Sequence, residues 1–96
     1  MSGRSLLFLA AARTEIREAL DWYLDRSPRA ADRFLSEIDT AVILIRESPE
    51  AWSEFEPGTR RYVLNGFPYS IIYRDVGEVL QIVAVAHHKR RPGYWR

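Results

Sequence analysis

The 96-residue sequence contains no cysteine, one methionine and a single lysine, Lys89. Without cysteine the chain can form neither a disulfide nor a thiolate nucleophile, and thiolate metal sites are excluded as well. Because disulfides are rare in the reducing cytoplasm, this composition fits a cytoplasmic protein. No apolar run approaches the ~20 residues of a membrane-spanning helix, so we expect no membrane partner.

Length and apolar content indicate one folded domain covering residues 1–96. Single hydrophobic cores usually serve ~50–200 residues, and 47% of the residues are hydrophobic, which argues against disorder. The apolar run within residues 1–12 is short, and a charged helical segment follows at once without a clear cleavage context. A first buried strand is therefore favoured over a secretory signal peptide.

Charge is divided unevenly along the chain, although the net charge is only +1. Residues 1–59 carry seven basic and eleven acidic side chains, a net charge of −4, whereas residues 60–96 carry seven basic and two acidic side chains, a net charge of +5. Such asymmetry indicates an anionic partner for the basic part. Alternatively, acidic helices simply neutralise a basic sheet.

The first half of the chain predicts two amphipathic helices. One runs from about Arg13 to Arg26, and the second begins at Ser27-Pro28, where a capping hydroxyl precedes a proline at the first helical position. Ser48-Pro49 ends the second helix. Apolar residues recur at helical spacing in both, and the predicted buried stripes are Ile16, Ala19, Leu20, Tyr23 and Leu24 in the first helix and Ala31, Phe34, Leu35, Ile38, Ala41, Val42 and Ile45 in the second.

Strands are predicted on either side of the helical hairpin. The first is Ser5–Leu9; after a loop over Pro49–Thr59 the later ones, separated by short turns that imply antiparallel neighbours, are Arg61–Asn65, Tyr69–Arg74 and Val79–Ala86. In the last strand, alternation predicts one face made of Leu80, Ile82, Ala84 and Ala86 and the other made of Gln81, Val83, Val85 and His87. The order β-α-α-β-β-β predicts an α+β fold, in which a helical hairpin packs on a small, largely antiparallel sheet.

Arginines stand at the ends of the predicted strands. Arg60 and Arg61 open one strand and Arg74 closes the next, so an antiparallel hairpin places them near a common edge. Planar guanidinium groups suit phosphates because they donate paired hydrogen bonds. Arg74 also has an ordinary interpretation, an ion pair with Glu78 across the turn. The tail that begins at His87 leaves from the opposite end of the sheet. The tail residues and the strand-end arginines would form one surface only if the tail folds back across the open face of the sheet.

The last ten residues carry four cations, two histidines, two large aromatic rings and no acid. Such a segment cannot be core and predicts a surface for a polyanion; its cations are Lys89, Arg90, Arg91 and Arg96. Tyr94 and Trp95 either stack on nucleobases, worth ~1–3 kcal/mol per base, or fold back onto the core as a clasp. The clasp is favoured for Trp95, and both interpretations stay open for Tyr94.

The two histidines, His87 and His88, either transfer protons in phosphodiester cleavage or hydrogen-bond within the fold. The structural role is favoured for each. Neighbouring residues of a strand point to opposite faces and no further ligand stands nearby, so we expect no zinc site, no other metal and no cofactor. Three carboxylates on one face of the first helix indicate a solvated surface rather than acid catalysis; they are Glu18, Asp21 and Asp25.

Several segments together resemble the RelE/ParE toxin superfamily. In the second half they are Gly58-Thr59-Arg60-Arg61, Phe67-Pro68-Tyr69-Ser70-Ile71-Ile72-Tyr73, Val85-Ala86-His87 and then Arg90, Pro92, Tyr94 and Trp95; in the first half they are Ala30, Phe34 and Pro49. The similarity covers nearly the whole chain. It implies the toxin of a type II toxin–antitoxin, or plasmid stabilisation, module with a helical hairpin against an antiparallel sheet. The implied partner is a cognate antitoxin, a small protein whose C-terminal segment folds on binding.

The superfamily divides by mechanism. RelE-like members cleave mRNA in the ribosomal A site, and by resemblance the catalytic roles would fall on Arg61, Arg90 and Tyr94, with His87 as a further candidate. ParE-like members inhibit DNA gyrase and are not known as nucleases. The ending Arg-Pro-x-Tyr-Trp resembles the ParE-like group, and the catalytic lysines often found in RelE-like members have no clear counterpart here.

We therefore expect a growth inhibitor that acts on DNA gyrase without catalysis. The alternatives are a ribosome-dependent mRNA endoribonuclease and a degenerate toxin that retains only antitoxin binding. The predicted target-binding residues are Arg60, Arg61, Arg74, Lys89, Arg90, Arg91, Tyr94, Trp95 and Arg96.

Overall fold

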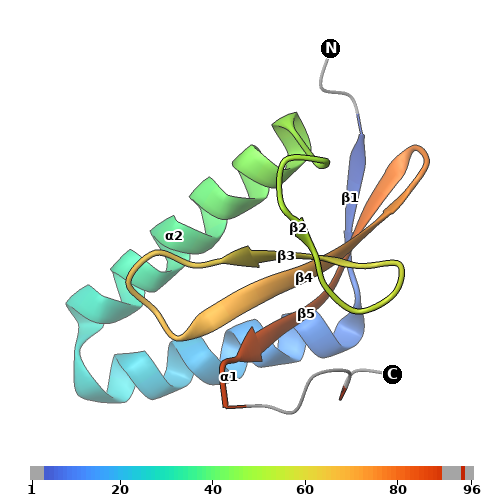
Figure 1. Ribbon diagram of the computed structural model, residues 1–96. Coiled ribbons are helices and arrows are strands. Elements are labelled where there is room, and N and C mark those ends of the chain that lie inside the picture. Colours follow the sequence, from blue (N-terminus) through green and yellow to red (C-terminus); the bar gives the residue numbers. More distant parts are fainter. Residues whose placement is uncertain (1–3, 90–93, 95–96) are drawn as a thin grey trace.

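The computed structural model describes residues 4–89 and Tyr94, and it confirms the predicted α+β fold, a helical hairpin packed on a largely antiparallel sheet (Figure 1). The helices are α1 (Ala10–Arg26) and α2 (Pro28–Glu47). The strands are β1 (Ser5–Phe8), β2 (Ser53–Glu54), β3 (Arg60–Val63), β4 (Tyr69–Val76) and β5 (Val79–His87). Among the described residues, neither helix combines the length and the apolar character that crossing a membrane requires.

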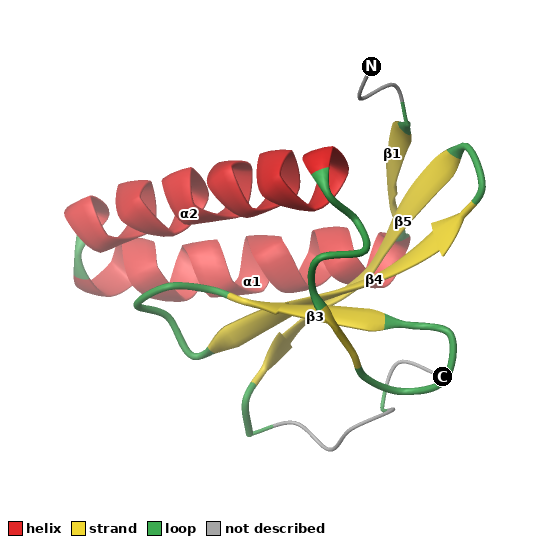
Figure 2. Ribbon diagram, turned by 45° about the horizontal axis from the view of Figure 1, so that its top comes forward, coloured by secondary structure: helices red, strands yellow, loops and turns green. Residues whose placement is uncertain are grey.

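Within the described part of the chain, five strands form one sheet in the order β1-β5-β4-β3-β2. The three later strands are antiparallel neighbours, as predicted from the short turns. β1 pairs in parallel with β5, with Phe8 opposite Ile82 as its last partner. β2 lies inside the segment that was predicted to be a loop. Its two residues pair only with the start of β3. Both helices lie on one side of the sheet (Figure 2).

The helices begin and end for local reasons. The hydroxyl of Ser27 accepts a hydrogen bond from the backbone N–H of Ala30 at 3.2 Å, and Pro28 opens α2, which confirms the predicted cap. α1 starts at Ala10, three residues before the predicted Arg13, because a run of alanines has the highest helix propensity. The Arg13 guanidinium donates to the carbonyl of Phe8 at 2.8 Å and ties this early start to β1.

The main core lies between the helices and the sheet. Phe34 is fully buried at its centre, with the rings of Tyr23, Phe67 and Tyr69 at centroid distances of 5.4, 5.4 and 5.5 Å. Such edge-to-face and tilted contacts add to the stabilisation from area burial. Leu24 and Leu35 were predicted in the buried stripes, but they are 47% and 39% exposed. The sheet covers a narrower sector of each helix than the apolar stripe spans.

A bulge in β5 changes which side chains share a face. Ile72 pairs with Ala84 but Tyr73 pairs with Ile82, so Val83 is an extra residue in β5. Before the bulge Leu80 and Ile82 point to the helix side, while after it Ala84 and Ala86 point to the other side; the prediction that these four share one face is therefore wrong.

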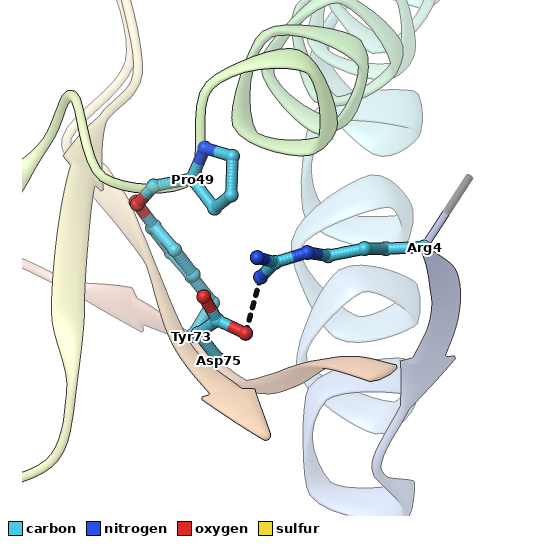
Figure 3. A network of polar contacts seen from close by, with 4 residues as sticks. All are labelled: Arg4, Pro49, Tyr73 and Asp75. Atoms are coloured by element: carbon cyan, nitrogen blue, oxygen red, sulfur yellow. Dashed lines mark hydrogen bonds and ion pairs between the residues drawn. The ribbon is translucent and has the colours of Figure 1, made fainter. Parts of the chain in front are cut away.

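A polar network holds the far end of β4 against the rest of the fold (Figure 3). The Tyr73 hydroxyl donates to the carbonyl of Pro49 at 2.6 Å, and Arg4 forms an ion pair with Asp75. Burial raises the pKa of Tyr73 to about 12, an effect that outweighs the lowering by Arg60. The hydrogen bond to Asp75 raises the pKa of Arg4. These contacts connect β4 to the loop after α2 and to β1.

Candidate functional site

A second apolar cluster lies on the side of the sheet away from the helices. Its buried members, contributed by β4 and β5, are Ile72, Val83, Ala84 and Ala86, and the partly buried residues packed on them are Leu9, Phe55 and Tyr94. We call this surface, together with Arg61, the outer sheet face. This cluster is small, and single side chains from outside the helices pack on it instead of a whole helix.

Arg61 projects onto this face from β3. It is the cross-strand partner of Ile72, and directly opposite residues of an antiparallel pair point to the same side of the sheet. Its guanidinium carbon lies 4.7 Å from the ring centroid of Phe55, a distance typical of cation–π contact. The side chain is exposed, and no carboxylate of the described residues forms an ion pair with it. Arg61 therefore presents a positive charge whose orientation is restricted by the contact with Phe55.

Tyr94 reaches the same face and is fixed there by α1. Its hydroxyl donates a hydrogen bond to one carboxylate oxygen of Glu15, while the other oxygen accepts from the backbone N–H of Val85 at 2.8 Å. Tyr94 therefore lies on the face that carries Arg61. For Tyr94 the interpretation as a clasp on the core is supported by this contact.

The two histidines lie on opposite sides of the sheet. His87 pairs with Tyr69 on the helix side, where the two rings meet edge to face with centroids 5.0 Å apart. His88 instead brings its Nε2 to 3.1 Å from the hydroxyl of Ser70, a buried residue of the outer sheet face. The bulge at Val83 inverts the alternation and so separates His87 from Arg61.

Arg60 and Arg74 lie near Arg61, as predicted, because the start of β3 pairs with the end of β4, but the two side chains point to opposite sides of the sheet. Arg60 turns to the helix side, where its guanidinium donates to the carbonyl of Trp52 at 2.7 Å and to that of Glu50 at 3.4 Å. Arg74 is exposed, and in the described structure it forms no ion pair with Glu78, so the ordinary interpretation of that residue fails. Lys89 is exposed beyond the end of β5.

Four predicted site residues lie outside the described part of the chain; they are Arg90, Arg91, Trp95 and Arg96. Their roles stay predictions. Of the full predicted set, the structure brings Arg61, Arg74 and Tyr94 to the outer side of the sheet and places Arg60 and His87 on the other side.

Sequence reasoning missed two residues of this site. Phe55 was part of a predicted loop, although an aromatic residue among polar neighbours just before Pro57-Gly58 is a signal of a buried anchor. Glu15 gave no signal, because an acidic residue on an amphipathic helix normally faces water. That Glu15 holds β5 is seen only from its hydrogen bond with Val85, which lies 70 positions later in the sequence.

The outer sheet face is suited to binding more than to bond cleavage. It combines a planar cation, a phenyl ring and a phenol, which together recognise anionic or aromatic groups. The phenol is held by a carboxylate, and the imidazole of His88 is occupied by the Ser70 hydroxyl. Proton transfer would require either group to leave its present partner.

Comparison with known proteins identifies a matching family, a similar sequence and a similar fold. The family described as "ParE toxin of type II toxin-antitoxin system, parDE" matches residues 6–92. "Toxin ParE2" of Mycobacterium tuberculosis, in the strains CDC 1551 / Oshkosh and ATCC 25618 / H37Rv, is 29% identical over 79 residues, which cover 81% of this chain and 75% of that protein. A chain of the solved structure "Chromosomal ParDE TA system from P. aeruginosa" superposes with a TM-score of 0.77 at 21% identity, covering 91% of this chain and 98% of the other.

Proposed function

Because this chain belongs to the ParE toxin family of type II toxin–antitoxin systems, we propose that it inhibits growth by binding DNA gyrase through its outer sheet face. In this proposal it acts as a stoichiometric inhibitor and needs no catalytic group. A cognate antitoxin neutralises it.

The observation that carries the proposal is the exposed guanidinium of Arg61 on the ring of Phe55, on the face that also holds Tyr94. Arginine and tyrosine are enriched among the residues that dominate binding energy at protein interfaces. The contact with Phe55 restricts the Arg61 side chain before binding, which lowers the entropy that must be lost on association. Such an anchor suits an acidic surface of a target protein.

The arrangement gives less support to an mRNA endoribonuclease. By resemblance, cleavage would use Arg61, Tyr94, Arg90 and His87 around one phosphate. His87 lies across the sheet from Arg61, and the Tyr94 hydroxyl is hydrogen-bonded to a carboxylate. A general acid or base must come within about 3 Å of the proton that it transfers, and His87 faces away from the surface where Arg61 would hold the phosphate.

The antitoxin partner is expected to bind by an acidic segment that is disordered alone and orders on the toxin. Residues 60–96 carry a net charge of +5, so acidic side chains on that segment would complement them. Association should weaken with added salt, because charges near the surface are screened beyond about 10 Å at 0.1 M ionic strength.

The decisive experiment measures supercoiling by purified gyrase in the presence of the purified chain. We expect inhibition by the wild type, loss of inhibition by Arg61→Ala, and intact mRNA after induction in cells. Arg33→Ala is the matched control, because Arg33 also lies over a phenylalanine, Phe67, at 5.6 Å, but on α2 and not on the outer sheet face. Normal supercoiling with folded wild-type protein would overturn the gyrase proposal, and transcript cleavage on induction would favour the endoribonuclease.

A further inference from the structure

A concave site lies on the helix side of the sheet, where α1 passes the end of β5. A cavity of about 230 Å³ is lined there by residues that include Glu15, Glu18, Trp22, Tyr69, Val85 and His87. We call it the α1–β5 cavity. Its volume is several times the ~30 Å³ share of one water molecule in the liquid, so it has room for a side chain. It lies across the sheet from Arg61 and plays no part in the proposed gyrase contact.

The cavity adjoins a stretch of β5 that lacks a strand neighbour. β1 ends opposite Ile82, so within the described residues the segment from Val83 to His87 has no strand on this side. The carboxylate of Glu15 accepts the hydrogen bond of the Val85 N–H in place of a strand. The cavity therefore lies beside a stretch of β5 whose edge is closed by a side chain of α1 instead of a strand.

The chemistry of the lining is acidic and aromatic. Its carboxylates belong to Glu15 and Glu18, and among the described residues no arginine or lysine lines it. Both oxygens of Glu15 accept hydrogen bonds from neutral donors, which leave its negative charge in place. In the described structure the Glu18 carboxylate has no hydrogen-bond or ion-pair partner. Trp22 is 50% exposed, which is unusual for the largest apolar side chain.

We infer that the α1–β5 cavity receives an arginine side chain of the cognate antitoxin; the inference depends on the proposed function only in taking the antitoxin as the partner. A guanidinium can stack on the indole of Trp22 and donate paired hydrogen bonds to Glu18. Lysine supplies the same charge but not the planar fork that both contacts use.

Within the protein, Arg26 already makes a guanidinium–indole contact with Trp22. The guanidinium carbon of Arg26 lies 3.7 Å from the ring centroid of Trp22, and Arg26 also donates to the Trp22 carbonyl at 3.0 Å. Arg26 does not line the cavity, so it fixes the indole from outside. The indole is thereby held in position for a second cation.

The test is a double-mutant cycle on the complex of the full chain with the purified antitoxin encoded beside it, followed by calorimetric titration. On the toxin the variants are Glu18→Gln and Trp22→Leu, and the control is Asp21→Asn, an exposed acid of α1 that does not line the cavity. On the antitoxin, each arginine is changed in turn to methionine. Unchanged circular dichroism and unfolding midpoints establish that the toxin variants are folded.

We expect Glu18→Gln to weaken the complex at least about tenfold, since hydrogen bonds between charged groups are worth ~1.5–3 kcal/mol. One antitoxin arginine should couple to Glu18 and to Trp22 but not to Asp21. If the complex forms and no arginine couples to Glu18 more strongly than to Asp21, the inference is overturned while the proposed function stands. If the wild-type chain forms no complex at all, the inference is overturned together with the antitoxin part of the proposed function, while gyrase inhibition is tested separately by the supercoiling assay.

Discussion

The carboxylate of Glu15 on α1 accepts a hydrogen bond from the backbone N–H of Val85 on β5, 2.8 Å away, and a second one from the hydroxyl of Tyr94. One side chain thus closes the edge of β5 where β1 has ended and holds the C-terminal tyrosine on the outer sheet face. The helix that forms part of the core also sets the position of the proposed binding surface.

Removing this carboxylate should destabilise the fold. In Glu15→Ala the Val85 N–H loses its acceptor, and we expect the free energy of unfolding to fall by about 1–3 kcal/mol. Urea denaturation measures this change. Tyr94→Phe combined with Glu15→Ala should cost less than the sum of the two single changes, because both remove the same hydrogen bond. Simple additivity would show that Tyr94 and Glu15 act independently.

Growth inhibition should depend on the planar shape of Arg61 as well as on its charge. Arg61→Lys keeps the charge but loses the stacking of a flat guanidinium on Phe55, so we expect reduced toxicity on induction. Stability should change by less than about 0.5 kcal/mol, since the side chain is exposed. Arg46→Lys is the control, an exposed arginine of α2 with no aromatic partner in the described structure. Equal toxicity of both lysine variants would show that charge alone suffices.

Tyr73 should make stability sensitive to alkaline pH. Burial raises the pKa of the Tyr73 phenol from 10.0 to about 12. The neutral phenol therefore stabilises the fold fully below about pH 10, and this stabilisation is lost as the pH rises towards 12. Tyr73→Phe loses the hydrogen bond to Pro49 and should be less stable at neutral pH by about 1 kcal/mol. The difference in the free energy of unfolding between wild type and Tyr73→Phe should decrease by about 1 kcal/mol from about pH 9 to about pH 11, as measured by urea titrations. If this difference in the free energy of unfolding stays constant over the range, Tyr73 ionises as readily in the folded protein as in the unfolded chain.

The junction of the two helices should depend on one hydroxyl. Ser27→Ala removes the acceptor for the Ala30 N–H at the start of α2, and such caps contribute about 1 kcal/mol. Thermal unfolding followed by circular dichroism measures the loss. Ser36→Ala, in the exposed middle of α2, is the matched control and should have a far smaller effect.

Local sequence signals predicted most of the elements because their causes are local. The Ser27-Pro28 pair marks the start of α2, and the turns at Gly66 and Gly77 adopt the positive φ angles that glycine tolerates. The parallel pairing of β1 with β5 and the two-residue β2 were not predicted, because both depend on contacts between distant segments.

The sequence by itself determined the helical hairpin, the three antiparallel strands, the family and a basic second half with Arg61 in it. Only the tertiary structure decided which cations and imidazoles share a surface. The physical reason is the period of two along a strand: one extra residue, Val83, inverts every later position, so His87 falls on the helix side and His88 on the outer side. That residue is placed by the pairing of β5 with β4, and no pattern within β5 alone reveals it.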